Sequence, residues 1–219
     1  MPPESELSPT GPAAVLDPYA PPETGLAAAA AAPVQGVNFG PRFAARIIDL
    51  VPHYVSSFVG GILVAVPIVL MASLAGRSAD EAIDGLENSG WLAFLLSLAG
   101  SILADAFSEG FAGATLGKRL LGLQVVRTHG GRVSFLPALK RSIAFLWDSL
   151  FFGILAYQKM SETPLQQRYG DHWAGTVVVR RKSLPPEVRA PDGRFFLVFL
   201  LATFANGLIQ AIGYLTVFA

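Results

Sequence analysis

The dominant pattern in this chain is a series of long apolar segments separated by polar stretches. The first segment runs from about Phe43 to Ala75, and from Leu50 onward it contains no charged residue. At a rise of about 1.5 Å per residue, such a helix easily crosses a hydrocarbon core of about 30 Å. Pro52 and Pro67 inside it predict a bend or a locally unwound turn, which neighbouring helices can tolerate in a membrane.

Three more apolar segments follow, at Trp91–Phe107, Ile143–Tyr157 and Phe195–Ala219. The second begins with a tryptophan, a residue enriched at membrane interfaces, and the last is long and apolar. The third is marginal in length and contains Asp148. Together the four segments predict an all-α transmembrane fold with three to four membrane helices.

A β-rich stretch lies between the second and third segments. Residues 121–135 have strand-forming flanks around Gly130 and Gly131, which is typical of a β-hairpin. Another β-rich stretch, Thr176–Arg180, follows the third segment and is placed to add a strand to that hairpin. We therefore expect a small β-hairpin or sheet at the membrane surface.

The two ends of the chain differ from its centre. Residues 1–38 are rich in Pro and Ala and lack the basic start of a secretory signal, so we expect a disordered tail. Residues 39–182 then form a membrane domain, residues 183–194 a linker, and residues 195–219 an additional C-terminal transmembrane helix.

Composition agrees with membrane insertion and excludes several kinds of chemistry. Charged residues make up only 15% of the chain, compared with roughly 25% in soluble domains, and the mean hydropathy is +0.49. The absence of cysteine excludes disulfides, thiolate metal sites and cysteine nucleophiles. A net charge of zero gives no sign of a nucleic-acid partner.

The distribution of basic residues predicts the orientation, because basic loops stay cytoplasmic. Residues 76–90 carry one arginine against four acids and are expected outside, whereas the N-terminus and the basic stretch that includes residues 121–135 are expected inside. The protein would then lie in the plasma or inner membrane with a cytoplasmic sheet. Residues after Tyr157 are also basic, so we favour a re-entrant or surface-lying third segment, with three full crossings and the C-terminus outside. A full crossing by this segment is the alternative.

Charged side chains within the apolar segments form a repeated pattern, and such residues are rare at membrane depth. Arg42 and Asp49 lie two helical turns apart on one face, and Arg46 is placed to pair with Asp49. Arg141 and Asp148 repeat the seven-residue spacing. The two segments are therefore either packed as equivalents or alike by chance.

Three further ionisable residues complete this set of candidates. Asp105 and Glu109 share a face at the inner end of the second segment, where they can meet the arginines of the first and third segments. Left unpaired, such carboxylates would carry protons, whereas paired ones would fix the docking of helices. His53 shares a face with Asp49, which suits a proton relay or a cation site, although a packed, hydrogen-bonded histidine is the commoner arrangement.

Several sequence runs resemble the RDD family. They are GPRFAARIIDL, ATLGKRLLGLQVV, GGRVSF with LKR, and QQRYGDHWAGTVVVRR, spread over residues 39–181. The family is named for one arginine and two aspartates, which correspond here to Arg42, to Asp49 and, within the GDHWAGTVVV run, to Asp171. The resemblance implies at most transport of an undetermined ligand, with cation/proton antiport suggested for some relatives. The tail and the C-terminal helix are departures from the family pattern.

Other motifs have simpler interpretations. Residues 115–119 are similar to a phosphate-binding loop but lack the Walker spacing, so we expect Lys118 and Arg119 to contact lipid phosphates instead. Asp171 lies between basic residues, and a salt bridge that anchors the sheet competes with a ligand-binding role. No histidine spacing suits zinc and no catalytic constellation is present. We therefore expect no metal, no cofactor and no enzyme activity.

Two functions are consistent with this sequence. In the first, a transport-type protein acts as a homo-oligomer, because three crossings enclose little volume. Asp49 then binds a cation or proton, Arg42 tunes it, and Asp105 or Glu109 supplies a second carboxylate. In the second, a non-catalytic scaffold or accessory subunit uses its Arg–Asp pairs to lock helices. Convergence of Asp49, Asp105 and His53 on a polar cavity would favour transport, whereas carboxylates capped by arginine in a closed core would favour the scaffold.

Overall fold

Three long helices dominate the computed structural model, which describes residues 35–78, 90–148 and 153–215. They are α2 (Phe39–Leu74), α4 (Gly90–Ala112) and α9 (Asp192–Leu215). Each is long and apolar enough to cross a membrane. The predicted all-α transmembrane fold is therefore confirmed, with three candidate spans. The expected tail, up to residue 34, and the acidic residues of the 76–90 stretch lie outside the described residues.

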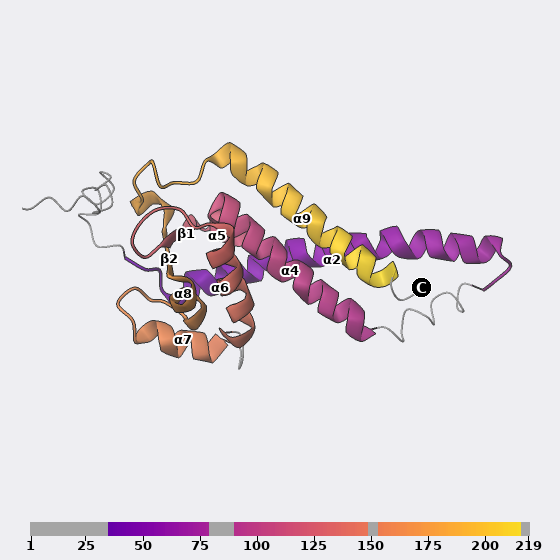
Figure 1. The fold of residues 1–219 in the computed structure, drawn as a ribbon, viewed down its shortest axis with the longest axis horizontal. Coiled ribbons are helices and arrows are strands. Elements are labelled where there is room, and N and C mark those ends of the chain that lie inside the picture. The colour runs from indigo at the N-terminus through magenta and orange to yellow at the C-terminus, as the bar shows by residue number, and fades with distance from the viewer. Residues whose placement is uncertain (1–34, 79–89, 149–152, 216–219) are drawn as a thin grey trace, which may run out of the picture.

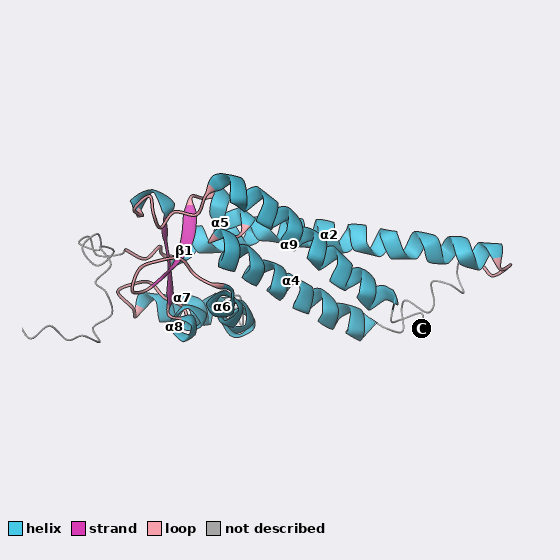
Figure 2. Ribbon diagram, turned by 45° about the horizontal axis from the view of Figure 1, so that its top comes forward, coloured by secondary structure: helices cyan, strands magenta, loops and turns pink. Residues whose placement is uncertain are grey.

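Shorter elements gather at one end of the long helices (Figures 1 and 2). In chain order they are α5 (Leu116–Leu120), β1 (Leu123–Arg127), α6 (Phe135–Asp148), α7 (Ile154–Ser161), α8 (Tyr169–Ala174), β2 (Thr176–Arg180) and the 3-10 turn η2 (Arg181–Ser183). We call these elements and their connections the sheet end. The chain thus divides into a bundle of long helices and a compact sheet end that covers one end of that bundle.

The C-terminal helix holds the other two spans together. α9 packs along both α4 and α2, whose backbones have little direct contact with each other. At Gly60 of α2 a Cβ would lie only 2.9 Å from the carbonyl oxygen of Gly207, so the absence of a side chain permits the close approach of α9. Beside it, the Asn206 amide donates a hydrogen bond of 2.6 Å to the Ser56 hydroxyl. These polar side chains therefore dock one span on another.

The outer faces of the long helices carry large apolar side chains. Tyr54, Phe58 and Leu63 on α2, Phe94 on α4 and Phe204 on α9 are all more than half exposed. An apolar surface of this extent is unfavourable in water and is expected where acyl chains are the solvent. Pro52 and Pro67 both lie inside α2, which stays helical through them, so the local unwinding considered there does not occur.

Helix α6 turns its polar side inward and its apolar side outward. Arg141 and Asp148 are buried, whereas Ile143 and Trp147 are exposed. After residues 149–152, which lie outside the description, the third apolar segment continues as α7 at the same end of the molecule (Figure 1). In the described residues this segment forms no helix long enough to span a membrane. The outward apolar side instead favours a surface-lying segment, with Trp147 at the interface.

The sheet consists of two antiparallel strands, β1 and β2, centred on the pair Val125 and Val178. The expected pairing of Thr176–Arg180 with the first β-rich stretch is therefore confirmed. The expected hairpin is wrong in its second arm, because only an isolated bridge joins Arg132 to Val126. Beyond this bridge, residues 133–134 are loop, and α6 begins at Phe135.

Residues 183–194, expected to be a linker, are packed against the sheet. The Leu184 and Val188 side chains are buried in one cluster with valines of both strands. The Gln124 amide of β1 donates to the Val188 carbonyl oxygen over 2.9 Å, and the Ala190 N–H donates to the Gln124 side-chain oxygen over 3.1 Å. This connection therefore fixes where α9 begins relative to the sheet.

Two parts of the sheet end repeat each other. Residues 115–127 (TLGKRLLGLQVVR) and 168–180 (RYGDHWAGTVVVR) align without gaps, with two glycines, two valines and the final arginine at matching places. Each part contains a short helix, a glycine with positive φ and a strand. The first short helix packs on α2 and the second on α6. Since the matching residues Val125 and Val178 pair with each other in antiparallel strands, an approximate two-fold rotation relates the parts.

The close contact of α5 with α2 leads to a first prediction. A Cβ at Gly117 would collide with the carbonyl oxygen of Ala45, whereas a Cβ at Gly40, also on α2, would meet nothing within 4 Å. We expect Gly117→Ala to destabilise the detergent-solubilised protein by about 1–3 kcal/mol, as overpacking does. Gly40→Ala should leave the thermal unfolding midpoint unchanged or slightly higher. Equal midpoints for the two variants would contradict the described packing of α5.

Candidate functional site

Ten charged side chains gather where the long helices meet the sheet end. They are the cations Arg42, Arg46, Lys118, Arg141 and Arg168 and the acids Asp49, Asp105, Glu109, Asp148 and Asp171. Every candidate site residue predicted from the sequence except His53 and Arg119 belongs to this set. The formal charges cancel, which is the condition for placing so many ions in a poorly solvated place.

Asp171 is the most deeply buried acid of this network, with no exposed side-chain surface. Its two oxygens contact Arg42 (Nη1 to Oδ2, 2.5 Å) and Arg141 (Nη1 to Oδ1, 3.2 Å). Burial alone would raise the pKa of Asp171, but the charges of Arg141, Arg42 and Arg168 hold it well below its ordinary value. Asp171 thus joins α2 to α6 and α8, and its main partners come from distant helices rather than from its neighbours in sequence.

Glu109, near the end of α4, connects two cations. Its Oε2 lies 2.9 Å from Arg141 Nε, and its Oε1 lies 2.7 Å from Lys118 Nζ. Burial alone would lower the pKa of Arg141, but Glu109 and Asp171 raise it above its ordinary value. Lys118 therefore turns inward, and Arg119 pairs with Asp192. The expectation that both contact lipid phosphates is corrected, because each has a protein partner and a mostly buried side chain.

Asp49 differs from the other acids in its partners. Its carboxylate accepts hydrogen bonds from the Thr115 hydroxyl (2.6 Å) and the Gly117 N–H (2.7 Å) at the start of α5. The expected pair of Arg46 with Asp49 is wrong, since Arg46 pairs with Asp105 of α4 instead. Within the described residues, Asp49 is the one acid of the network with no basic nitrogen in ion-pair range.

Asp148 repeats the role of Asp49 in the second half of the approximate two-fold. It accepts the Gly170 N–H at the start of α8 over 3.2 Å, as Asp49 accepts the matching Gly117 N–H. Burial raises the pKa of Asp148, although Arg168 at 3.4 Å opposes that shift. The expectation that the two Arg-x6-Asp segments pack as equivalents is therefore supported by how each receives a short helix, although α6, unlike α2, is not a candidate span among the described residues.

The symmetry breaks at the residue after each of these glycines. The position is Lys118 in the first half and Asp171 in the second. Asp171 can accept both Arg42 and Arg141, whereas Lys118 would repel them, and Glu109 separates it from Arg141. Thr115 and Gly117 were not predicted as site residues. The gapless match between residues 115–127 and 168–180 is the sequence signal that could have indicated them, and hydrophobic periodicity alone does not display it.

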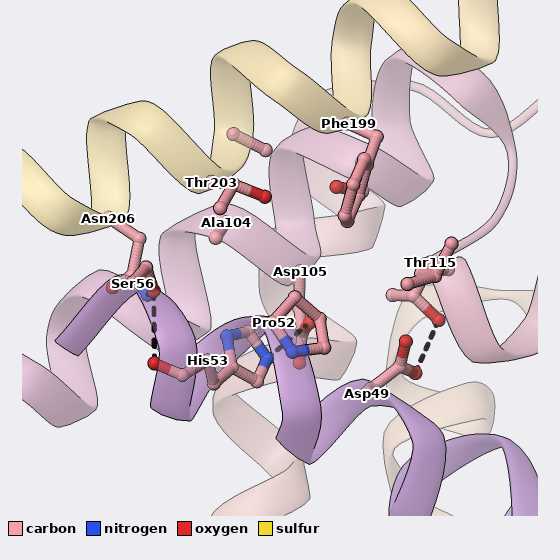
Figure 3. A pocket seen from close by; sticks show the side chains of 13 residues that line it. Asp49, Pro52, His53, Ser56, Ala104, Asp105, Thr115, Phe199, Thr203 and Asn206 are labelled. Atoms are coloured by element: carbon pink, nitrogen blue, oxygen red, sulfur yellow. Dashed lines mark hydrogen bonds and ion pairs between the residues drawn. The ribbon is translucent and has the colours of Figure 1, made fainter. Parts of the chain in front are cut away.

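A small cavity, lined by both polar and apolar side chains, lies between α2, α4 and α9 (Figure 3). Its volume is about 20 Å³, enough for about one water molecule. Asp49, His53 and Asp105 line it, together with Ser56 and Asn206. His53 Nε2 lies 3.1 Å from Asp105 Oδ1, so the histidine is hydrogen-bonded, as in the commoner of its two expected arrangements. The three residues whose convergence was the test for transport therefore do share a cavity.

This architecture defines a membrane protein with three candidate spans and a buried charge network at one end. The family model for the RDD family matches residues 37–219, and the chain belongs to that family. The match runs through α9 and so includes the C-terminal helix that we expected to be a departure from the family pattern. Arg42 and Asp171, two of the three residues that the sequence resemblance matched to the family name, contact each other directly. No curated protein and no solved structure matches the chain.

Removal of the Asp171 charge leads to a second prediction. Asp171→Asn leaves Arg42 and Arg141 buried without their shared counter-ion, and breaking a buried pair in this way costs about 3–5 kcal/mol. We expect a large drop in the thermal unfolding midpoint of the detergent-solubilised protein. The matched control is Asp192→Asn, which removes a carboxylate that is 76% exposed to solvent and should have a much smaller effect. A similar, small drop for both variants would show that the buried pair is not required.

The raised pKa of Asp148 gives a third prediction. Because the folded pKa lies above the ordinary value of 3.8, the folded protein binds this proton more tightly than the unfolded chain does. The contribution of Asp148 to stability therefore increases as the pH falls through the folded pKa. Asp148→Asn keeps an acceptor for the Gly170 N–H but cannot titrate. The rise in the thermal unfolding midpoint on acidification should therefore be smaller in the variant than in the wild type.

The range for this measurement follows from Asp171. Its lowered pKa contributes stability that is fully present above the unfolded pKa of about 3.9 and is lost only as the pH falls through the lower folded pKa. Melting curves from about pH 8 to about pH 4 cover the range above the unfolded pKa, and the Asp171 contribution, which wild type and variant share, cancels when the two are compared. Parallel curves for wild type and Asp148→Asn would contradict the assigned direction.

Proposed function

We propose that the protein is a transport-type membrane protein in which Asp49 takes up a proton or a monovalent cation. The observation that carries this proposal is the state of Asp49: it is a buried carboxylate within a candidate span, it has no basic partner in ion-pair range among the described residues, and it lines a water-sized cavity. Ionisable groups in such positions are costly and are typical of proton and ion pathways. His53 and Asp105, on the same cavity, supply the neighbouring groups of a relay.

The contacts of Asp49 suggest what its neutralisation would do. The ionised carboxylate accepts two hydrogen bonds from the start of α5, and bonds to a charged group contribute about 1.5–3 kcal/mol each. Neutralising Asp49 weakens these bonds, so α5 is held less firmly against α2. Since β1 follows α5 directly, a change at Asp49 would be passed to the sheet.

Charge distribution supports a cytoplasmic position for the sheet end. Of the 16 lysines and arginines, all except Arg77 belong to the sheet end, to residues 183–194 or to the adjacent ends of α2 and α9. Positive residues are retained on the cytoplasmic side. We therefore place the N-terminus and the sheet end inside, in the plasma or inner membrane. Three spans enclose little volume, which supports a homo-oligomer as the working form. We propose no enzyme activity for it.

A flux assay tests the role of Asp49 and is our fourth prediction. We expect Asp49→Asn to abolish proton-coupled cation flux in proteoliposomes loaded with a pH-sensitive dye, because asparagine cannot exchange a proton. Its amide oxygen still accepts the Gly117 N–H, so insertion and yield should stay near wild type. The matched control is Glu162→Gln on the surface near α7, which removes an exposed carboxylate and should leave flux unchanged. Wild-type flux in Asp49→Asn would rule the mechanism out.

The second candidate is a scaffold or accessory subunit, favoured by one observation. Asp105, Glu109, Asp148 and Asp171 each lie against a basic side chain, which is the arrangement of groups that lock helices together. In this case Asp49→Asn should lower protein abundance in the membrane with no separable loss of flux. Measuring abundance and flux on the same preparations distinguishes the two functions.

A further inference from the structure

A second and much larger cavity lies beside the charge network. Its volume is about 320 Å³, and its walls come mainly from α2, α6 and α7. This size falls within the range of about 300–1,000 Å³ that is typical of small-molecule sites. The cavity is distinct from the small one around Asp49 and His53, which do not line it.

The charges that face this cavity are mostly positive. Five cations and three acids line it: Arg42, Arg46, Lys118, Arg141 and Arg168, with Asp105, Glu109 and Asp148. Asp49 and Asp171, which balance the network as a whole, do not line it. A charge close to the cavity acts on its contents more strongly than one behind the wall, because electrostatic interaction falls with distance. The cavity therefore favours an anion, even though the network is neutral.

Two of these cations have donors that no protein group uses. The Nε of Arg42 and the Nη2 of Arg141 are buried and have no hydrogen-bond partner. The side chains of Arg42 and Arg141 are 9% and 1% exposed. A buried donor without an acceptor costs free energy, so such atoms mark places where an additional acceptor would stabilise the structure. The Oδ1 atom of Asp148 is likewise buried without a donor, which suits a ligand that also carries a hydroxyl group.

The remaining wall of the cavity is apolar. It includes Phe39, Phe43, Ile47, Phe145, Ala156 and Met160. Phe43 and Ile47 are each about half exposed, on the outward face of a candidate membrane span. An occupant would therefore have cations on one side and, on the other, apolar side chains continuous with the lipid-facing surface of α2.

We propose that this cavity binds a phosphate group carried by an amphiphile, with hydroxyl groups beside the phosphate. Arg42 and Arg141 donate to the phosphate oxygens, since arginine suits phosphate geometry, and Asp148 accepts from a hydroxyl. The apolar wall receives the first part of the acyl chains. The site does not depend on proton uptake at Asp49, although Asp105 lines both cavities and its partner Arg46 lines the larger one.

Binding of defined lipids to the full-length protein in detergent tests the proposal and is our fifth prediction. Phosphatidylglycerol should bind saturably and raise the thermal unfolding midpoint, whereas phosphatidylcholine should not. Ala156→Phe fills the cavity without removing a charge. It should weaken phosphatidylglycerol binding about tenfold or more, because a headgroup displaced by the ring loses at least one hydrogen bond to a charged group. Ala44→Phe makes the same change at an exposed position of α2 outside the cavity and should bind as wild type does.

A second measurement uses the wild-type protein, so that a failure of Ala156→Phe to fold does not end the test. A phosphatidylglycerol with a photoreactive headgroup should crosslink to α6 or α7 residues that line the cavity, and excess unlabelled lipid should prevent it. Glycerol phosphate tests whether a soluble phosphate compound occupies the site. If it competes with the lipid at equal concentration, the site is assigned to a free phosphate. If it does not compete, the site is assigned to the lipid. Equal binding of both lipids, unchanged binding by Ala156→Phe, or crosslinks elsewhere would overturn the proposal. Loss of flux in Asp49→Asn has no bearing on these outcomes.

Discussion

The contact of Asp171 with Arg42 and Arg141 is the constraint on which the rest of this structure depends. Three full charges lie where water has little access, and none of them would be tolerated there without the others. Their backbones belong to α2, α6 and α8, so keeping the charges together also keeps one candidate span against two elements of the sheet end. The remaining cations and acids extend this cluster toward α4 and α5 and bring its formal charge to zero. Charge neutrality, more than apolar packing, thus fixes how the sheet end sits on the bundle.

The approximate two-fold explains why the cluster has its particular composition. Each half offers an Arg-x6-Asp helix to a short helix whose second residue is glycine, and the aspartate accepts that glycine N–H. Perfect symmetry would place identical charges on both sides of the axis, where they would repel. Lys118 in one half and Asp171 in the other remove this repulsion, and Glu109 from α4 compensates the lysine. Helix α4 is not part of either half of the repeat. The one difference between the halves, Lys118 against Asp171, therefore brings α4 into the same network.

The sequence predicted the parts of this structure that depend on the solvent and failed where partners are distant in the chain. Span length and apolarity follow directly from the bilayer, so α2, α4 and α9 could be located before any contact was known. Arg46 was assigned to Asp49 because they are three residues apart, but Asp105 on another helix is its partner. Arg42 and Asp171 are separated by 129 positions, and no local periodicity encodes such a pair. The second arm of the hairpin is reduced to one bridge, at Arg132, because the chain leaves the sheet there and enters α6 at Phe135.

The position of α9 has a consequence for how the protein is made. This helix follows every other described element in the chain, yet the backbones of α2 and α4 pack mainly on α9 rather than on each other. During translation, the first two spans therefore leave the ribosome without the surface that will hold them. Until α9 arrives, polar groups such as Ser56 on α2 have no interhelical partner in the lipid. Until then, α2 and α4 are joined by the side-chain contacts of Asp105 with Arg46 and His53, so the bundle reaches its full packing only once α9 is inserted.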